Sequence, residues 1–456
     1  MKNKVVLFSG VDSEGFAQLP LPVLSIGTTL QNEHFDPLII DVQIESNWEE
    51  RLLVELKDAL FFGISCMTGT SIKNALKAIE LSRKYYPDLT IVFGGYHASS
   101  AYASLLLECD VDYVIVGPGE KAIAKMANLL ANKDRKNISE NDLKNIPNLA
   151  YLCNGSVIKN DFEMIEDMDS FVPSMNYELV NISDYYYTNK VTSTQRRFYY
   201  CSSYGCPGNC TFCSEQKHTH LRWKGLSAHR IVNDLKDIKL KYEPERVQFV
   251  DPCFTTDIAR VVEFARLMNE EDWKVNIMFD ARISDLKRLS EKINFEELHK
   301  AGVEKIYTGI ETGSNRLLKA LNKTFTCDDA YRMCHLLNEA GIITHLSFVH
   351  DFPNETDEDS EKTFELCTKL AQLKNIRQLH RIFVPFEGTI LYEELLNKNL
   401  IRKQGQNAWA DTCTDGISNI WKGRKAFREK VVSNIENLSK QYPEVFKYQR
   451  PLIVND

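Results

Sequence analysis

The sequence contains no run of about 18 uninterrupted apolar residues, so no transmembrane helix is predicted. Its start, MKNKVVLFSG, lacks the long apolar core and the cleavage site of a signal peptide, and we therefore expect a cytoplasmic protein. An excess of basic residues is also absent. The formal charge is −8, which argues against nucleic acid as the main partner, because phosphate binding requires a basic surface.

The sequence does contain enough apolar residues for a large core. It has 456 residues, of which 43% are hydrophobic and 26% are charged, as in globular proteins. This length predicts two or three domains. There are twelve cysteines, and four of them fall between residues 201 and 213. Because structural disulfides are rare in a reducing compartment, clustered cysteines are interpreted first as metal or redox sites.

Residues 1–145 alternate β-rich runs with amphipathic helical stretches such as 71–86. The strand candidates are 5–8, 37–41, 60–65, 90–95 and 111–117. This order predicts an α/β domain with a doubly wound parallel sheet and any ligand at the carboxyl ends of the strands. Residues 146–195 are polar and irregular, and we predict a linker region with some structure of its own.

A second alternation covers residues 196–390 and predicts another α/β domain. Its later strand candidates are 246–251, 274–280, 303–311, 342–350 and 378–386. Six β/α units imply a partial (β/α)6 barrel of the TIM type, whose active site would lie at the carboxyl ends of the strands. Residues 391–456 are expected to form a small, mainly helical C-terminal appendage.

Three of the clustered cysteines have a spacing that suits a metal cluster. Cys206, Cys210 and Cys213 are separated by three and then two residues, in a loop rich in glycine and proline. Such a loop can curl so that three thiolates converge on a 4Fe–4S cluster, whose fourth iron is then open for another ligand. A zinc site completed by His218 and His220 is the competing interpretation.

The CxxxCxxC spacing after the first barrel strand, with Phe212 before the last cysteine, resembles the signature of the radical S-adenosylmethionine (SAM) superfamily. The resemblance covers about residues 196–390. It implies that the amine and carboxylate of SAM chelate the open iron and that reductive cleavage gives a 5′-deoxyadenosyl radical, which abstracts hydrogen. Cys201 lies outside the pattern and is expected to be a core residue.

Later segments resemble further motifs of the superfamily. Residues 248–254 are similar to F-x-D-D-x-F, with proline in place of the second aspartate, and residues 309–323 are similar to the G-I-E-S-G-S stretch. Residues 352–359 resemble G-x-P-G-E-T, although Asp351 and Asn354 stand where that pattern has glycine. Residues 385–389 are likewise similar to P-x-P-G-T.

The resemblance also implies residues that contact SAM. Its ammonium and ribose require carboxylates and hydroxyls, so Asp251 and Glu311 are candidates, together with Phe212 of the cysteine motif. Arg282, after the third barrel strand, could pair with a carboxylate. For each of the charged residues the alternative is an ordinary salt bridge of the barrel.

The N-terminal domain has a second set of motifs. Ser65-x-Met67, followed by 26 residues and then Gly94-Gly95, resembles the S-x-L and G-G elements of cobalamin-binding Rossmann-like domains. Residues 117–120, GPGE, resemble the G-E-G-E stretch of the cobalamin-dependent branch of the superfamily. A nucleotide-free Rossmann-like fold is the alternative. The cofactor-binding candidates are Ser65, Met67, Gly94, Gly95, Gly117 and Glu120.

The histidine that binds cobalt from below in some cobalamin domains is absent. Where the motif that carries it would stand, residues 19–24 read Leu-Pro-Leu-Pro-Val-Leu. His34 is too late in the chain, and His97 is expected beside the nucleotide tail. Cobalamin is therefore expected to bind without a protein imidazole below cobalt.

The combined resemblance implies a cobalamin-dependent radical SAM enzyme, with methylation of an unactivated carbon as its commonest activity. Cyclisation, ring contraction or rearrangement is the first alternative. A methylthiotransferase would need three ligand cysteines in the N-terminal domain, where only Cys66 and Cys109 are available, and a cobalamin sensor would not need the cysteine loop. The expected partners are a small-molecule or peptide substrate and an electron donor of the flavodoxin or ferredoxin type.

Overall fold

The structure is a computed structural model that describes residues 3–11, 17–172, 174–187, 196–412, 420–450 and 452. The chain forms two compact units. The first comprises residues 1–196, 217–224 and 403–412, and the second comprises residues 197–216, 225–402 and 413–456. Two short segments, 217–224 and 403–412, thus belong to the first unit, although the sequence-based boundaries assigned them to the barrel and the C-terminal appendage.

The first unit is built on one sheet, with the strand order β2-β1-β3-β4-β5-β6-β7. Its strands are β1 (Lys4–Ser9), β2 (Asp36–Asp41), β3 (Phe61–Ser65), β4 (Thr90–Gly94), β5 (Tyr113–Ile115), β6 (Leu149–Cys153) and β7 (Ser156–Lys159). Strands β1 to β5 are parallel, which confirms the predicted sheet. Strands β6 and β7 extend it antiparallel, so part of the predicted linker belongs to this sheet.

Helices cover both faces of this sheet, which explains why its strands are continuous apolar runs rather than alternating ones. Val5, Val6 and Phe8 of β1 are completely buried. The helices are α1 (Leu21–Asn32), α2 (Trp48–Leu56), α3 (Ser71–Tyr85), α4 (Tyr96–Glu108), α5 (Glu120–Asn132), α6 (Glu140–Leu143), α7 (Met168–Phe171), α8 (Ile182–Tyr187) and α18 (Gln406–Ala410). The strand order places the switch point, where ligands bind in such folds, at the carboxyl ends of β1 and β3.

The second unit contains a parallel sheet with the order β15-β14-β13-β12-β11-β8, which confirms the predicted partial barrel. Its strands are β8 (Arg197–Tyr200), β11 (Arg246–Phe249), β12 (Asn276–Asp280), β13 (Val303–Glu311), β14 (Ile343–His350) and β15 (Ile376–Ile382). Two short strands, β9 (Ser203–Tyr204) and β10 (Lys224–Gly225), and helix α9 (Glu215–Thr219) follow β8.

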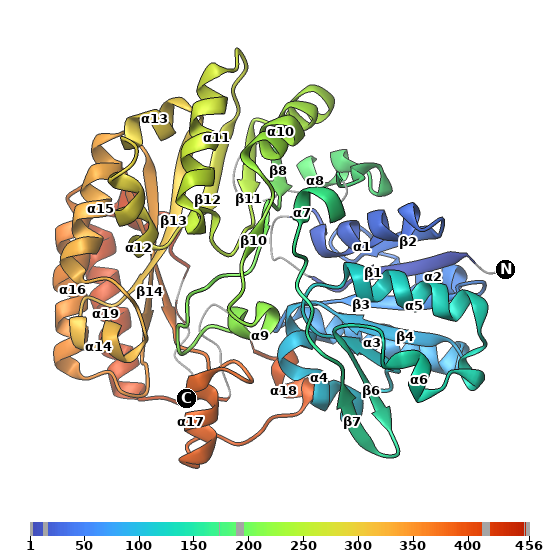
Figure 1. Cartoon of the computed structure of the whole chain (residues 1–456). Helices are drawn as coiled ribbons and strands as arrows, with labels where there is room; N and C mark the ends of the chain where they lie inside the picture. The colour runs from blue at the N-terminus through green and yellow to red at the C-terminus, as the bar shows by residue number, and fades with distance from the viewer. Residues whose placement is uncertain are drawn as a thin grey trace. The chain divides into compact units, whose positions relative to one another are not determined.

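Helices line the outside of this sheet, and most of them pack on one another, as Figure 1 shows. They are α10 (Ala228–Tyr242), α11 (Ile258–Glu270), α12 (Ile283–Ser290), α13 (Phe295–Lys300), α14 (Asn315–Ala320), α15 (Cys327–Glu339) and α16 (Asp357–Ala371). The C-terminal segment contributes α17 (Ile390–Asn397), α19 (Lys425–Gln441) and α20 (Pro443–Phe446), as the predicted helical appendage requires. The sequence patterns did not predict the short helices α12 and α14.

Strand β15 is an outer strand, and its edge is covered by the end of the chain. The Gln449 side chain accepts a hydrogen bond from the His380 backbone N–H (2.6 Å) and donates one to the His380 carbonyl (3.2 Å). Helix α20 packs against the same strand. Covering an outer strand in this way prevents its pairing with another chain.

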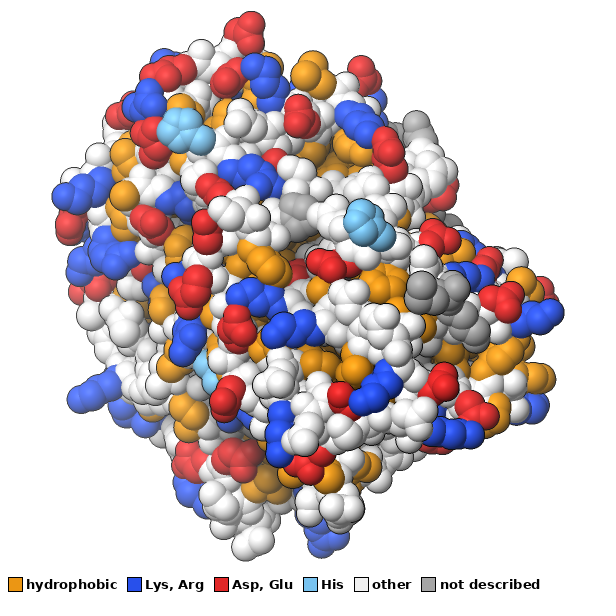
Figure 2. Space-filling view, turned by 45° about the vertical axis from the view of Figure 1, so that its right-hand side comes forward, with side chains coloured by type: hydrophobic (Ala, Val, Ile, Leu, Met, Phe, Trp, Pro, Cys, Tyr) orange, Lys and Arg blue, Asp and Glu red, His pale blue; other side chains and the backbone are white. Residues whose placement is uncertain are grey.

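Among the helices of the described residues, none is both long and apolar enough to cross a membrane. On the face drawn in Figure 2, Lys and Arg side chains are interspersed with Asp and Glu side chains and do not form a basic surface.

Candidate active site

The three predicted cluster ligands lie in one loop that directly follows the first barrel strand. Cys206, Cys210 and Cys213 are all partly exposed, in contrast to the buried cysteines of the core. The Gly208 backbone N–H donates to the Cys206 sulfur (3.4 Å), and the Gln216 side chain donates to the carbonyls of Cys210 (3.2 Å) and Cys213 (3.0 Å). The loop (residues 205–213, here the cysteine loop) is therefore held by its own polar contacts.

The chemistry of this loop fits a cluster better than a single ion. In the part of the chain that the structure describes, no three His, Cys, Asp or Glu side chains gather closely enough to hold one metal ion. A 4Fe–4S cluster makes a weaker demand, because each thiolate ligates a different iron. His218 and His220, the partners of the zinc alternative, stack instead on Tyr96 and Phe162 of the first unit.

Cys206 contacts a row of polar side chains from the segments that follow the next two strands, β11 and β12. The pKa of Cys206 is lowered, first by its interaction with the Cys253 side chain and also by the Gly208 N–H and the Arg282 charge. Cys253 in turn donates to Asp285 (3.3 Å), which pairs with Arg282 at 2.7 and 2.8 Å. Arg282 thus forms a salt bridge within the barrel, the alternative named for it, with a carboxylate of helix α12.

The Asp251 carboxylate makes its hydrogen bonds with other residues of the protein interior. It is almost completely buried, and it accepts hydrogen bonds from the Ser202 N–H (2.7 Å), the Ser202 hydroxyl (2.5 Å) and the Ser203 hydroxyl (2.6 Å). Arg260 lies 3.8 Å from the same carboxylate. Because both oxygens are engaged, Asp251 holds the backbone that leads from β8 into the cysteine loop.

Glu311 and a lysine that sequence reasoning did not select form a buried ion pair beside the cysteine loop. The Lys323 ammonium lies 2.7 Å from Glu311 and 5.6 Å from the centre of the Phe212 ring. Burial opposes the charge of Lys323, yet Glu311 and the thiols of Cys210 and Cys213 outweigh it, so the pKa of Lys323 is raised. Glu311 also has a positive φ of 69°, a strained conformation typical of functional sites.

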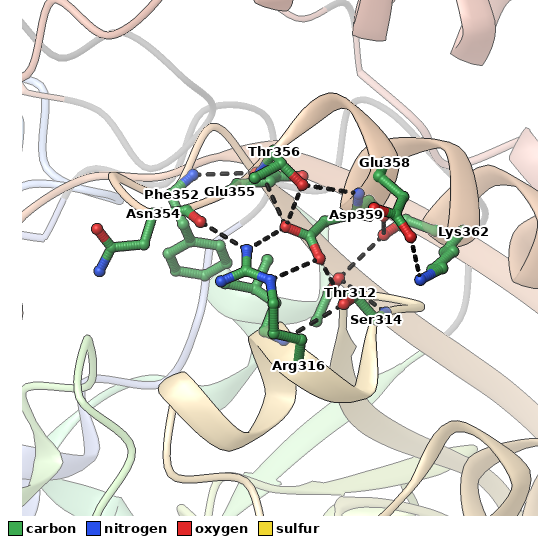
Figure 3. Close-up of polar contacts among 12 residues, drawn as sticks. Thr312, Ser314, Arg316, Phe352, Asn354, Glu355, Thr356, Glu358, Asp359 and Lys362 are labelled. Atoms are coloured by element: carbon green, nitrogen blue, oxygen red, sulfur yellow. Dashed lines mark hydrogen bonds and ion pairs between the residues drawn. The ribbon is translucent and has the colours of Figure 1, made fainter.

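The loops after β13 and β14 are fastened to each other through Asp359, as Figure 3 shows. Its carboxylate accepts from the Ser314 hydroxyl (2.5 Å), from Arg316 and from the Thr356 backbone and hydroxyl (both 2.8 Å). A Cβ on Gly313 would come within 2.3 Å of a carbonyl of α16, so this position requires glycine. The motif at residues 309–323 thus has a structural role in joining the two loops.

In the first unit, three of the predicted cofactor-binding residues follow strands β3 and β4 at the carboxyl edge of the sheet. Ser65 ends β3 and is half-buried, while the Met67 side chain is 54% exposed. Gly94 ends β4, and a Cβ placed there would meet nothing closer than the Ile64 carbonyl at 3.9 Å. Gly94 is therefore not closely covered by other parts of the protein.

The other three predicted residues are filled or engaged by the protein. A Cβ on Gly95 would lie 2.8 Å from the Cys66 carbonyl, and one on Gly117 would lie 2.7 Å from the His218 carbonyl. Both glycines also have a positive φ. Glu120, the first residue of α5, is buried and accepts a hydrogen bond from the Ser25 hydroxyl (2.8 Å). These three residues therefore contribute to the packing beneath the carboxyl edge of the sheet and not to its exposed surface.

Neither histidine of the N-terminal domain lies exposed at this edge. His34 falls between α1 and β2, at the amino end of its strand. His97 is buried, with its Nδ1 3.0 Å from the Thr68 hydroxyl and its Nε2 2.6 Å from the Gln406 side chain. Burial lowers its pKa to about 4. Both ring nitrogens of His97 are therefore engaged within the protein.

The segment 217–224 packs on the first unit instead of forming a solvated loop. The His218 ring stacks on Tyr96 at 4.3 Å, and its Nδ1 lies 2.9 Å from the Ser99 hydroxyl. The His220 ring stacks on Phe162 at 4.1 Å, and Arg222 lies over the same ring. Burial lowers the pKa of His218 to about 4, so it is neutral at pH 7.

Sequence reasoning missed Cys253, Asp285 and Lys323 around the cysteine loop. A signal existed for two of them: Cys253 lies within the strand-end motif at 248–254, and Lys323 ends the motif at 309–323. No local pattern distinguishes Asp285 from the other carboxylates of the helices, because its role depends on the position of β11.

Comparison with known families finds two matches. The model of the radical SAM superfamily matches residues 200–367, which contain the cysteine loop and strands β11 to β14. The model of the B12 binding domain matches residues 11–127, which contain Ser65, Met67 and the glycines of the N-terminal edge. The two matches do not overlap and each falls on one of the two sheets.

Related proteins of known sequence span most of the chain. An uncharacterized methyltransferase of Pyrococcus horikoshii is 26% identical over 394 residues, 84% of this chain and 79% of that protein. An anaerobic magnesium-protoporphyrin IX monomethyl ester cyclase of Synechocystis sp. is 25% identical over 346 residues, 75% of this chain and 66% of the cyclase.

Among solved structures, the radical SAM methyltransferase TsrM from Kitasatospora setae, with cobalamin and a [4Fe-4S] cluster bound, is similar to this chain with a TM-score of 0.73. The match covers 89% of this chain and 80% of that protein at 17% identity. A likeness at this identity establishes the fold of both units.

Proposed function

This chain belongs to the radical SAM superfamily and carries a B12 binding domain, and we propose that it transfers a methyl group to an unactivated carbon of a small-molecule or peptide substrate. It is a radical SAM enzyme, and its cofactors are a 4Fe–4S cluster, SAM and cobalamin. The observation that carries the proposal is the presence, in one chain, of a three-cysteine loop after the first barrel strand and a Rossmann-like carboxyl edge that carries Ser65, Met67 and Gly94.

When bound, the cluster and SAM supply a 5′-deoxyadenosyl radical, and cobalamin carries the methyl group. The protein contributes orientation and the exclusion of water. In this proposal Cys206, Cys210 and Cys213 ligate the cluster, and Ser65, Met67 and Gly94 contact cobalamin. The buried Glu311–Lys323 pair supports the cysteine loop from β13.

The proposal can be tested with SAM deuterated in its methyl group. In protein reconstituted with the cluster and cobalamin and supplied with reductant, we expect S-adenosylhomocysteine to form and cobalamin to acquire the label. With the true substrate present, the label should appear in the product, and 5′-deoxyadenosine and S-adenosylhomocysteine should form in similar amounts. Mass spectrometry of the small molecules measures all of these species.

Protein without cobalamin provides the control, since it should still form 5′-deoxyadenosine but no S-adenosylhomocysteine. An unlabelled product without S-adenosylhomocysteine would contradict methyl transfer and favour cyclisation or rearrangement, the activity class of the cyclase relative. A methylthiotransferase is less well supported, because Cys66 is fully buried and Cys109 is the only other cysteine of residues 1–145. A non-catalytic cobalamin sensor would produce no 5′-deoxyadenosine.

We further propose that the enzyme works in the cytoplasm and receives electrons from a donor of the flavodoxin or ferredoxin type. The proposal is supported by the cysteines of the described residues, which form no disulfide and are compatible with a reducing compartment, and by the one-electron reduction that a 4Fe–4S cluster requires. Nucleic acid is not proposed as a partner, in line with the formal charge of −8.

Cobalamin should bind without a protein nitrogen below cobalt. The electron paramagnetic resonance spectrum of the Co(II) form is expected to lack nitrogen splitting from an axial base, because both ring nitrogens of His97 are engaged and His34 lies at the amino end of β2. The His34→Ala and His97→Ala variants should give the same spectrum. Nitrogen splitting that disappears in either variant would contradict this assignment.

A further inference from the structure

The inner face of the barrel sheet carries one carboxylate that the proposed function does not yet use, that of Asp280. The register pairs Asp280 with Tyr307 and Tyr307 with His345. Paired residues of neighbouring strands point to the same side, and successive residues of a strand point to opposite sides. The preceding residue, Phe279, is completely buried and packs on Phe254, so its side is the helix-covered one and Asp280 points into the barrel.

Asp280 is accessible to solvent at the carboxyl end of the barrel sheet. Its side chain is exposed, yet the surrounding protein desolvates the carboxylate and raises its pKa to about 7. The position at the last residue of β12 is also where TIM-type barrels place the residues that contact ligands.

The electrostatic surroundings of Asp280 are acidic or neutral. After desolvation, the groups that raise its pKa are Cys253 and Asp251, both from the segment that follows β11. Tyr307, its cross-strand neighbour, has a pKa raised to about 12 and is therefore neutral at pH 7. By the same register the inner face also carries the cations Arg197, Arg246, Lys305 and Arg377. Each stands within the first three residues of its strand, and none of these described side chains forms an ion pair with Asp280.

The other carboxylates near this edge have partners. Asp251 is engaged by two serines and Arg260, Asp285 by Arg282, and Glu311 by Lys323. Within the described parts of the chain, the Asp280 side chain makes neither a hydrogen bond nor an ion pair. A desolvated carboxylate without a cation is costly to ionise, and an incoming cation removes that cost.

We propose that Asp280 binds the cationic cofactor by placing its carboxylate opposite the sulfonium of SAM, and that it thereby distinguishes SAM from S-adenosylhomocysteine. The inference rests on the cofactors of the proposed function but does not depend on methyl transfer. Phe254, which follows Cys253, packs on Phe279, which precedes Asp280, with ring centres 4.6 Å apart, and Cys253 interacts with the cluster ligand Cys206. SAM chelated at the open iron would therefore bring its sulfonium to this end of the barrel.

Such a residue would have a consequence for turnover. S-adenosylhomocysteine has the same amine, carboxylate, ribose and adenine as SAM but lacks the positive charge on sulfur. A carboxylate at the sulfonium therefore favours the departure of the neutral thioether and its replacement by a new molecule of SAM. The proposed methylation requires this exchange in every cycle, because one SAM is the methyl donor and a second is the radical source.

The test compares the two ligands in the Asp280→Asn variant. Equilibrium binding of SAM and of S-adenosylhomocysteine is measured with anaerobic, cobalamin-loaded holoenzyme whose cluster is kept oxidised, so that SAM is not cleaved. We expect the Kd of SAM to rise about tenfold or more, as loss of a charge–charge interaction in a partly desolvated site predicts, while the Kd of S-adenosylhomocysteine changes by less than about threefold. Asp280→Glu should preserve the preference for SAM.

Asp272→Asn is the matched control, since Asp272 is an exposed carboxylate just before the same strand and should leave both Kd values unchanged. Cluster iron and bound cobalamin confirm that each variant is intact. If Asp280→Asn weakens the binding of both ligands equally, or changes neither Kd, Asp280 is not the partner of the sulfonium. The inference is then wrong, while the cofactor assignment stands. If the unaltered holoenzyme does not bind SAM at all, the proposed function itself fails.

Discussion

Replacing Cys206, Cys210 or Cys213 with alanine is expected to remove the 4Fe–4S cluster, leaving essentially no iron or sulfide after anaerobic reconstitution. Each thiolate ligates a different iron, so two remaining ligands cannot hold a cluster whose fourth iron has no protein thiolate. SAM cleavage should be lost with the cluster. The measurements are iron and sulfide content and 5′-deoxyadenosine formation, while cobalamin binding by the first unit should persist.

Two neighbouring thiols provide the controls. Cys201→Ala should keep the cluster, because Cys201 lies outside the CxxxCxxC spacing and its sulfur donates to the nearby Ser203 carbonyl (3.5 Å). Cys253→Ala should also keep it, because Cys253 is completely buried behind Cys206 and bonded to Asp285. If the Cys206 variant kept a cluster that the Cys206/Cys253 double variant lost, Cys253 would be a substitute ligand. Loss of the cluster in the Cys201 variant would refute the ligand assignment.

The architecture could be predicted because local sequence patterns indicate its strands and most of its helices. Parallel strands covered on both sides are continuous apolar runs, and residues 5–8 and 60–65 show such runs in the sequence. The cysteine loop could be predicted for the same reason, since all its ligands lie within eight residues. Helices α12 and α14 were missed because eight and six residues are too few to show a helical period.

The partners of the candidate carboxylates could not be predicted, because they come from distant parts of the chain. Glu120 bonds with Ser25, 95 residues earlier, and Asp251 bonds with Ser202, 49 residues earlier. Sequence motifs indicated that these carboxylates matter but not whether they face a ligand or the protein. Asp280 was overlooked for the opposite reason: its strand is a continuous apolar run, and only the register shows that its last residue faces the barrel interior.

The packing of short connecting segments was also beyond sequence reasoning. Residues 217–224 have the composition of a solvated loop, yet His218 stacks on Tyr96 and hydrogen-bonds with Ser99. A histidine of this kind is stabilised by groups more than a hundred residues away in the chain. The same applies to residues 403–412, where Gln406 bonds with His97 of the N-terminal domain.

Asp351, which departs from the glycine of the family pattern, has a clear physical role in the second unit. It is completely buried and accepts hydrogen bonds from Arg428 (2.6 Å) and Arg424 (3.1 Å), while Trp421 donates to its carbonyl (3.1 Å). A Cβ on Gly423 would lie 1.9 Å from the same carboxylate, so the segment needs glycine there. Asp351 thus fastens the segment before α19 to the carboxyl end of β14.

This anchor has a cost, because Asp351 has a positive φ of 63°, where a residue with a Cβ is strained by about 1–2 kcal/mol. Asp351→Ala is expected to destabilise the second unit by about 3–5 kcal/mol, since it leaves two arginines, one of them buried, without their carboxylate. Asp351→Gly should relieve the backbone strain, so its free energy of unfolding should fall by about 1 kcal/mol less than that of Asp351→Ala. Urea unfolding measures the free energy, and hydrogen exchange of α19 should show reduced protection in both variants.

The glycine variant separates the two reasons for an aspartate at this position. If the side chain only tolerated the left-handed backbone, Asp351→Gly would be at least as stable as the unaltered protein, and the exchange of α19 would not change. If the carboxylate holds Arg424 and Arg428, the glycine variant must still be destabilised, with faster exchange concentrated in α19. Asp357→Ala, at an exposed carboxylate in the first turn of α16, should change the unfolding free energy by less than about 1 kcal/mol. Asp351 would then be a departure from the family pattern that the C-terminal arginines make favourable.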